Sequence, residues 1–390
     1  SSMMSQLKCP NRHPLLEVTT ASVAGIAEEC NICEGIPEAV GHPEGEVSAA
    51  TWQCCEQCGY RCCSKCVDKG LEPLAVEKDR FSKRLLRYCL QAFYYTDAER
   101  LQRARSLLPG GILASSAASR ECLQQLLTWF KTDFFTWCNH PSCSNCSAKT
   151  TMTSEGMVEA NDEELHYCAP RVEAWRCSDC NALARFPRYG DPMRLLETRT
   201  GRCGEWANCF TLCTAALGLS CRLVVDWTDH VWTEVLLDGH WLHCDPCECS
   251  LDNPFVYEEG WSKRLSYIVA FSTNEVVDVT RRYTQNWQAT AARRNLLPED
   301  TLAELIAKAD VAVRQMQLDC NQQARGETWQ RTMAGETALE ASATSSPQWR
   351  EAEMQELLHP PQEQTRPPQA LQGRLSGDEE WRRAREERER

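Results

Sequence analysis

The sequence predicts an α+β fold, in which helical segments are followed by a group of strands. Apolar residues recur at steps of three and four positions between residues 72 and 217, as on one face of a helix. The period changes to two between residues 221 and 280, as in half-buried strands. The chain also has 25 cysteines in 390 residues, gathered mainly at 9–66, 138–180 and 203–249. This clustering indicates metal binding or thiol chemistry.

Four helical segments are expected. The first extends from Glu72 to about Leu108 and stops at Pro109-Gly110-Gly111, a strong breaker. The third ends before Gly218, which suits a helix C-cap. The other predicted segments are Ser119–Trp137, the helical part of Thr198–Leu217, and Leu297 to about Arg325.

Five strands are expected after the third helix, each rich in β-branched or aromatic residues. The dipeptide Asp238-Gly239 between the second and third strands is a strong hairpin signal. The predicted strands are residues 221–227, 230–237, 240–244, 264–271 and 275–280.

Composition limits the classes of function. The net charge of −13 argues against nucleic acid as the main ligand, because phosphate binding needs clustered Lys and Arg. No apolar run reaches about 18 residues, so we expect no membrane span. The first residues lack a signal-peptide pattern, so we expect a reducing compartment, the cytoplasm and also the nucleus. Residues 335–370 are poor in large apolar groups and are expected to form a flexible linker before a charged tail.

The first cysteine cluster is arranged in four pairs, which suits two tetrahedral zinc ions in a cross-brace. Cys54 and Cys62 are neighbouring alternatives as ligands, and a disulfide knot is the alternative to metal binding. The segment looks like a treble-clef or cross-brace zinc finger of the RING, ZZ or C1-like kind, which usually binds partner proteins or ubiquitin enzymes. The predicted ligands are Cys9 with His13, Cys30 with Cys33, Cys55 with Cys58, and Cys63 with Cys66.

Two further CxxC pairs predict another structural metal site. Cys143-x2-Cys146 and Cys177-x2-Cys180 have the arrangement of two zinc knuckles. Four thiolates leave no open coordination position, so no catalytic role is expected for the ion. Cys138, His140 and Cys168 are rival ligands, and unligated core cysteines are the alternative. The acidic insert at 154–165 is expected to be an exposed loop.

Cys203, His230 and Asp245 are the residue types of a thiol hydrolase. Cys203 is expected at the start of a helix, where the helix dipole lowers the pKa of a thiol and favours the thiolate. His230 begins one predicted strand and Asp245 ends the next, so they could act as base and orienting carboxylate. The alternative is a buried cysteine beside a core histidine.

Several segments occur in a specific order: RFPRYGDPMRLLETRTGRCGEWANCFTLCTAALGL, DHVWTEV, HWLHCDPCE, WSKRLSYIVAF and VVDVTRRY. With DFFTW and WRCSDC upstream, they resemble the cytoplasmic peptide:N-glycanases over roughly residues 80–300. That family is a branch of the transglutaminase-like (papain-like) cysteine hydrolases. The tail LQGRLSGDEEWRRARE also resembles a C-terminal motif of some family members.

The resemblance implies a transglutaminase-like core with a structural zinc subdomain. The zinc finger expected before this core is predicted from its cysteine spacing and not from the resemblance. It implies hydrolysis of the amide that joins an N-glycan to Asn in misfolded glycoproteins, as part of ER-associated degradation, with conversion of Asn to Asp. Cys203 would be the nucleophile, His230 the general base and acid, and Asp245 the orienting carboxylate. Proteasome-shuttle or ubiquitin-system proteins are the further partners that it suggests.

The resemblance also implies other site residues. Cysteines 143, 146, 177 and 180 would hold one zinc ion in the core, in addition to two in the finger, and Glu248 would contact substrate. The tryptophans are expected either to stack on sugar rings in the cleft or to pack in the core. The residues that lie in the same motifs are Arg188, Glu205, Trp206 and Trp232.

Two alternatives to this function are amine transfer, as in transglutaminases, and a partner-binding or ubiquitin-system adaptor with little hydrolase activity. The N-terminal module and the polar residues 335–390 depart from the ubiquitin-related and mannose-binding domains of animal members. The expected domains are the finger (1–70), the helical part of the core (71–137), the zinc-knuckle subdomain (138–184), the catalytic core (185–296), a helix (297–334), and the linker and tail (335–390).

Overall fold

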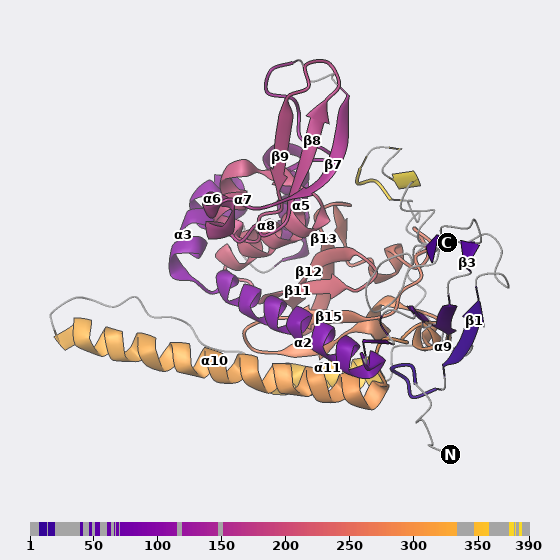
Figure 1. The fold of residues 1–390 in the computed structure, drawn as a ribbon. Coiled ribbons are helices and arrows are strands. Elements are labelled where there is room, and N and C mark those ends of the chain that lie inside the picture. The colour runs from indigo at the N-terminus through magenta and orange to yellow at the C-terminus, as the bar shows by residue number, and fades with distance from the viewer. Residues whose placement is uncertain are drawn as a thin grey trace. The chain divides into compact units, whose positions relative to one another are not determined.

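The structure is a computed structural model, and Figure 1 shows its ribbon. It describes residues 8–13, 15–19, 40–41, 47–48, 51–54, 61–63, 66, 68–69, 71–114, 119–146, 151–333, 347–358, 374–377, 379 and 382–383. The chain divides into two compact units. One unit combines residues 1–88 with 286–309, and the other combines residues 89–285 with 310–390.

The first unit contains a three-stranded antiparallel sheet in the order β1-β4-β5 and a separate pair, β2-β3. Cys9, Cys62, Cys63 and Cys66 are buried, and the Cys9 N–H donates to the His13 carbonyl at 2.9 Å. The predicted ligands Cys30, Cys33, Cys55 and Cys58 lie outside the described residues, so the two-ion finger stays a prediction. The strands are β1 (Leu16–Thr19), β2 (Val40–Gly41), β3 (Val47–Ser48), β4 (Thr51–Cys54) and β5 (Arg61–Cys63).

The second unit is built on a six-stranded antiparallel sheet in the order β14-β13-β12-β11-β15-β16. Figure 1 labels β13, β12, β11 and β15 of this sheet. All five predicted strands are present, and β14 is an addition. Asp238 and Gly239 have φ of 50° and 83°, as the two-residue hairpin between β12 and β13 requires. The strands are β11 (Cys221–Asp226), β12 (His230–Leu237), β13 (His240–Asp245), β14 (Ser250–Leu251), β15 (Ile268–Phe271) and β16 (Val276–Asp278).

Helix α8 (Cys203–Ala216) packs against β11 and β12 on one side and against α3 (Ala98–Leu107) and α7 (Pro192–Thr198) on the other. Because the helix is covered from both sides, its own residues are apolar or small on nearly all its faces, and nearly the whole helix is buried. Gly218 has φ of 81° and its N–H donates to the Ala215 carbonyl, which confirms the predicted helix end.

The other predicted helices are present with different bounds. The first is divided into α2 (Pro73–Ala92), a 3₁₀ turn (Phe93–Tyr95) and α3, because the Asp97 side chain caps a new helix by accepting from the Arg100 N–H. The second, α5 (Arg120–Trp129), continues as a π-helical turn only to Phe134. The remaining elements here are α4 (Gly110–Ala114), α9 (Trp287–Ala292), α10 (Glu299–Met333), and 3₁₀ turns at Pro254–Val256 and Thr280–Tyr283. No helix among the described residues is both long and apolar enough to cross a membrane.

The expectation of a loop at 154–165 is wrong, because this segment contributes a strand and a helix. Strand β7 (Met152–Val158) joins β8 (Val172–Cys177) and β9 (Leu183–Pro187) in an antiparallel sheet. Helix α6 (Asp162–His166) starts with a capping box between Asn161 and Glu164, and Glu164 also binds Arg185. Two short parallel strands, β6 (Thr136–Trp137) and β10 (Thr200–Gly201), pair elsewhere in the unit.

The linker expected at 335–370 contains helix α11 (Pro347–Leu358), so that expectation is wrong for these residues. Leu357 joins the apolar core of the second unit, and the Glu353 carboxylate accepts hydrogen bonds from Arg222 and Arg282. Arg222 is fully buried, also binds Glu234 at 2.6 Å and Glu275, and lies on the Trp241 ring. Burial raises the pKa of Glu275 to about 7. This ion-pair cluster therefore holds α11 against the rest of the second unit. The spacing of residues in the sequence does not indicate it.

Replacing Arg222 with Met should destabilise the protein by about 3–5 kcal/mol, because several buried carboxylates would lose their shared cation. The measurement is the midpoint of urea unfolding followed by tryptophan fluorescence. Lys83→Met is the control, since Lys83 pairs with Asp79 on the surface and its side chain is 75% exposed. Equal midpoints for the two variants would contradict a stabilising role for the cluster.

Candidate functional site

Cys203 is the first residue of α8, as the sequence predicts, and it is 7% exposed. The Glu205 carboxylate caps this helix start by accepting from the Arg202 N–H at 2.9 Å, and it receives two hydrogen bonds of 2.8 Å from Arg188. Arg202 is held in turn by Glu173. Burial alone would lower the pKa of Arg188, but Glu205, and then Cys203, raise it. A fixed cation therefore lies near the sulfur, which favours a thiolate.

Gly201 is needed for this arrangement. A Cβ atom at this position would lie 2.4 Å from the Glu205 Cβ, closer than side chains can approach. The Gly201 carbonyl also accepts hydrogen bonds from the Trp206 indole at 3.2 Å and from the Cys138 N–H at 2.9 Å. The glycine therefore lets the helix start close to the preceding chain.

His230 and Asp245 meet at one end of the central sheet. The register of β12 and β13 sets Thr233 opposite Cys244, which makes His230 and Asp245 diagonal neighbours on one face. The His230 Nε2 donates to the Asp245 Oδ2 at 2.7 Å, and both side chains are fully buried. The structure thus forms the predicted imidazole–carboxylate pair.

The other ring nitrogen of His230, Nδ1, is buried, and no hydrogen bond of ordinary geometry reaches it from the part of the chain that the structure describes. Burial would lower the pKa of His230, but the charge and hydrogen bond of Asp245, followed by the nearby Cys203, raise it overall. Because Nε2 is engaged by Asp245, Nδ1 is the nitrogen available to the Cys203 thiol. The three predicted residues are therefore brought together in the order thiol, imidazole, carboxylate.

Asp245 is held by more groups than His230. Its Oδ1 accepts from the backbone N–H groups of Cys247 at 2.8 Å and Glu248 at 3.3 Å, and its Oδ2 accepts from the Tyr257 hydroxyl at 2.9 Å. Burial alone would raise the pKa of Asp245, but the charge and hydrogen bond of His230 hold it well below its usual value. The carboxylate is therefore ionised and fixed in direction.

A second histidine, His243, supports the same carboxylate through Tyr257. Its Nε2 lies 2.7 Å from the Tyr257 hydroxyl. Because that hydroxyl donates to Asp245, its oxygen accepts from Nε2–H, which leaves Nδ1 of His243 to accept from the Asn253 N–H at 3.4 Å. Burial lowers the pKa of His243 to about 4, so the ring is neutral, as this tautomer requires.

The residues predicted to contact substrate differ in where their side chains lie. Trp232 is fully buried and donates to the Tyr283 hydroxyl at 2.7 Å, and Trp206 packs against Phe130 and Phe135. This geometry favours core packing for both tryptophans, and the Arg188–Glu205 pair supports the helix start. Glu248, beside Asp245, is the predicted residue closest to the reactive pair by hydrogen bonding.

Sequence reasoning missed His243, Tyr257 and Trp261. The Trp261 ring lies 4.8 Å from the His230 ring and 5.0 Å from the Tyr257 ring. Trp261 follows the 3₁₀ turn at Pro254–Val256 and occurs in no strand, so periodicity did not indicate it. His243 lies within a predicted strand, but its partner Tyr257 comes from this same irregular segment.

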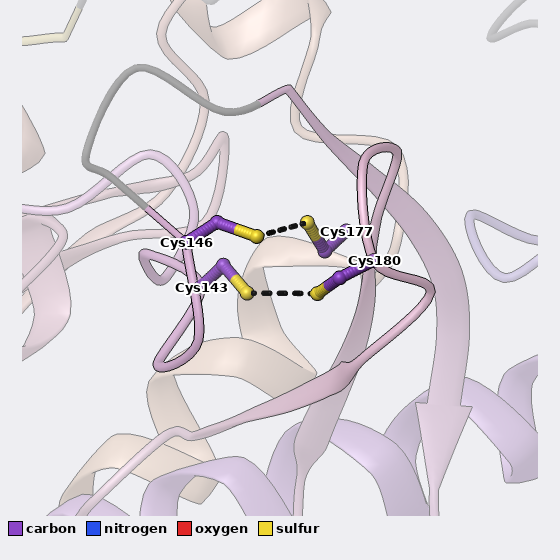
Figure 2. A group of neighbouring side chains, drawn as sticks. All are labelled: Cys143, Cys146, Cys177 and Cys180. Carbon is purple, nitrogen blue, oxygen red and sulfur yellow. Dashed lines mark hydrogen bonds between the residues drawn. The ribbon is translucent and has the colours of Figure 1, made fainter.

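Cys143, Cys146, Cys177 and Cys180 form a cluster in which all four sulfur atoms lie within 4.8 Å of one another (Figure 2). The Sγ atoms of Cys143 and Cys180 are 3.6 Å apart, and those of Cys146 and Cys177 are 3.8 Å apart. A backbone hydrogen bond at Asn145 lowers the pKa of Cys143 to about 7, whereas the hydrogen bond with Cys180 raises that of Cys146 to about 12. Four thiols this close cannot all ionise without a cation, so the group could hold a metal ion.

The rival ligands are not part of this cluster. Cys138 contacts Thr200 through a side-chain hydrogen bond, and Cys168 lies 3.3 Å from the Tyr94 hydroxyl. The His140 ring stacks near Trp175 at 5.5 Å. The structure therefore selects the two CxxC pairs among the candidates.

The chain matches two family models, the "Transglutaminase-like superfamily" over residues 151–246 and the "Rad4 transglutaminase-like domain" over residues 227–358. It is 43% identical over 291 residues to "Peptide-N(4)-(N-acetyl-beta-glucosaminyl)asparagine amidase" of Mus musculus, covering 74% of this chain and 40% of that protein. The human protein of that name is 42% identical over 291 residues, with coverage of 74% and 40%. The Arabidopsis thaliana one is 42% identical over 248 residues, with coverage of 59% and 34%. The chain thus spans about two fifths of the length of the animal relatives.

Among solved structures, a chain of "Crystal structure of Rad4-Rad23 bound to a 6-4 photoproduct UV lesion" aligns with a TM-score of 0.42 at 14% identity. The alignment covers 65% of this chain and 59% of that chain.

Proposed function

We propose that this chain belongs with the peptide-N(4)-(N-acetyl-beta-glucosaminyl)asparagine amidases, its homologues, and has a transglutaminase-like domain. From this premise, the protein is a hydrolase of N-glycosylated asparagine. The bond cleaved is the amide between the Asn side chain and the first sugar. The products are Asp in the polypeptide and a free glycan bearing a 1-amino group. The substrates are misfolded glycoproteins, and the setting is the cytosol during ER-associated degradation.

The observation that carries this proposal is the arrangement of Cys203, His230 and Asp245. The nucleophile starts a buried helix, the imidazole is within reach through Nδ1, and the carboxylate binds Nε2 at 2.7 Å. This is the order of groups that thiol acyl transfer needs, because one imidazole must both take and return a proton.

In the first step, the Cys203 thiolate attacks the amide carbon of the glycosylated side chain and forms a C–S bond. The negative charge that develops on the amide oxygen would be stabilised by backbone N–H groups at the start of α8. The C–N bond then breaks, and the imidazolium of His230 gives its Nδ1 proton to the leaving glycosylamine. A thioester and a neutral imidazole result.

In the second step, water attacks the thioester carbon while Nδ1 of His230 takes its proton. The C–S bond breaks, which returns the Cys203 thiolate and leaves an Asp side chain in place of Asn. Asp245 stays ionised throughout, because His230, Tyr257 and two backbone N–H groups hold its charge. It stabilises the imidazolium, which is present at the start of the first step and forms again in the second.

We also infer that the cluster of cysteines 143, 146, 177 and 180 holds structural zinc. Tetrahedral coordination with Zn–S bonds of about 2.3 Å places the sulfur atoms about 3.8 Å apart. The Sγ atoms of Cys143 and Cys180 are 3.6 Å apart, and those of Cys146 and Cys177 are 3.8 Å apart. The ion would join the loop at 143–146 to the turn between β8 and β9. Four sulfur ligands leave no position for substrate, so the ion's role is folding.

Cys177→Ser should lower the zinc content of the purified protein by about one ion per chain, because a tetrahedral site loses most of its affinity with one ligand. The measurement is zinc by mass spectrometry of acid-digested protein. Cys320→Ser, at an exposed position on α10, is the control and should leave the content unchanged. The same zinc content in both variants would contradict the assignment.

The test of the proposed activity is peptide mass spectrometry of a denatured high-mannose glycoprotein after incubation with the protein. The expected result is loss of the glycan and conversion of the glycosylated Asn to Asp, with one oxygen atom acquired from isotopically labelled water. A product in which an added amine replaces the glycan would favour amine transfer instead. Unchanged glycopeptides under reducing conditions would overturn the proposal.

A further inference from the structure

A short piece of the C-terminal tail, Arg374–Gly377, contacts the second unit beside the candidate site. In this otherwise polar region, Arg374 is 7% exposed and Ser376 is 5% exposed. Burial removes an Arg side chain from water at a considerable cost, so it needs compensating contacts. The segment therefore has a defined place on the protein.

The first contact of this segment is with Glu248. One carboxylate oxygen accepts from the Leu375 N–H at 2.7 Å, and the other accepts from the Ser376 N–H at 3.1 Å. Two charge-assisted hydrogen bonds from consecutive backbone groups fix the plane of the carboxylate. The backbone N–H of Glu248 in turn donates to Asp245, so Glu248 links this segment directly to the His230–Asp245 pair.

The second contact is with Trp261. The guanidinium carbon of Arg374 lies 4.3 Å from the centre of the Trp261 ring, a cation–π distance. The same ring lies 4.8 Å from the His230 ring, at an interplanar angle of 65°. The carbonyl of Arg374 accepts from Arg382 at 2.8 Å, which ties the segment to the next part of the tail.

We propose that Arg374–Ser376 completes the site: Arg374 positions Trp261, and through it the His230 ring, while the two backbone N–H groups orient Glu248. This inference rests on the proposed function for its substrate, but the positioning itself can be measured without substrate. Both contacts reach groups that adjoin Asp245 or His230, and Arg374 itself acts through Trp261. Arg374 is therefore a positioning residue, and residues 374–376 form part of the proposed site.

Arg374→Ala should lower kcat/KM for a denatured glycoprotein by roughly 10- to 100-fold, since a small displacement of a catalytic group can cost this much. It should also slow alkylation of Cys203 by iodoacetamide at mildly acidic pH, read by mass spectrometry of the Cys203 peptide. Arg374→Lys keeps the charge but loses the planar group, and should give an intermediate rate. Arg383→Ala, an exposed arginine of the same tail, should match wild type in both assays.

Ser376→Pro tests the Glu248 contact, because it removes one of the two N–H donors. Ser376→Ala keeps this donor but removes the side-chain oxygen that accepts from the Arg374 Nε at 3.4 Å, so it measures the side-chain contribution by itself. Proline should raise KM more than it lowers kcat, and it should raise KM more than alanine does, because only proline removes a donor to Glu248. Far-ultraviolet circular dichroism and the thermal midpoint verify that each variant is folded.

The outcomes separate the two proposals. Slower alkylation in Arg374→Ala supports positioning even where no glycopeptide is cleaved by wild type, which would overturn only the proposed activity. Alkylation and turnover equal to wild type in a folded Arg374→Ala variant would overturn the positioning role. Faster turnover after deletion of residues 374–390 would also overturn it, since the tail would then be an inhibitor.

Discussion

Replacing Cys203 with Ala should abolish conversion of glycosylated Asn to Asp, with a loss of kcat on the order of 10⁴- to 10⁶-fold. The reason is that the thiolate forms the new bond to the amide carbon, and no neighbouring group can substitute for it. The measurement is mass spectrometry of a denatured glycoprotein under single-turnover conditions, with equal amounts of folded enzyme.

The control for this prediction is Cys320→Ala, at an exposed position of α10, which should retain full activity. The Cys203→Ala variant is expected to fold like the wild type, because Cys203 is 7% exposed at a helix start and loss of its sulfur atom leaves only a small gap. A Cys203→Ala protein that still deglycosylates at a comparable rate would exclude the thiol mechanism.

Replacing Asp245 with Asn should lower kcat by about 10⁴-fold, close to the effect of the same change in a related arrangement. The amide retains the size of the carboxylate but loses its charge, so it no longer stabilises the imidazolium of His230. All the groups that contact the Asp245 carboxylate donate hydrogen bonds to it: two backbone N–H groups, the Tyr257 hydroxyl and His230. The NH₂ group of an asparagine would be a second donor facing one of these donors. The wrong tautomer of His230 would result, with the proton on Nδ1, which could then no longer take a proton from the Cys203 thiol or from water.

Tyr257→Phe is the graded control for this effect. It removes one of the hydrogen bonds to Asp245 and keeps the aromatic packing on Trp232 and Trp261. A loss of about 10- to 100-fold is expected, because a charge-assisted hydrogen bond contributes about 1.5–3 kcal/mol. The two variants should be compared by kcat and by the alkylation rate of Cys203. Equal activity of Asp245→Asn and wild type would contradict the role of the carboxylate.

Much of the site was predictable because its residues lie in regular elements. Cys203 starts a helix, and His230 and Asp245 lie at the same end of adjacent antiparallel strands, where strand register makes them neighbours. The CxxC pairs were predictable for a similar reason, since a tight turn holds two sulfur atoms toward one point. Local geometry was sufficient in these cases.

Residues whose roles depend on distant partners were not predictable in this way. Tyr257 and Trp261 come from an irregular segment. Their rings pack against His230, and the Tyr257 hydroxyl donates to Asp245. The segment that forms α11 is predicted to be a flexible linker because residues 335–370 are poor in large apolar groups, yet Glu353 reaches the buried Arg222. The insert at 154–165 is predicted to be a loop because it is acidic and polar, although β8 pairs with it through the backbone.

The sequence by itself indicated the main helices and the central strands, the two CxxC pairs as metal-ligand candidates, and the thiol, imidazole and carboxylate as a candidate catalytic group. These depend on periodicity and spacing within a few turns of chain. Only the tertiary structure decided how Asp245 is held, that Glu205 and Arg188 support the helix start, and that Arg374–Ser376 contacts Glu248 and Trp261. The physical reason is that buried charges choose partners by proximity in the folded core, and sequence spacing carries no record of contacts more than 100 residues apart.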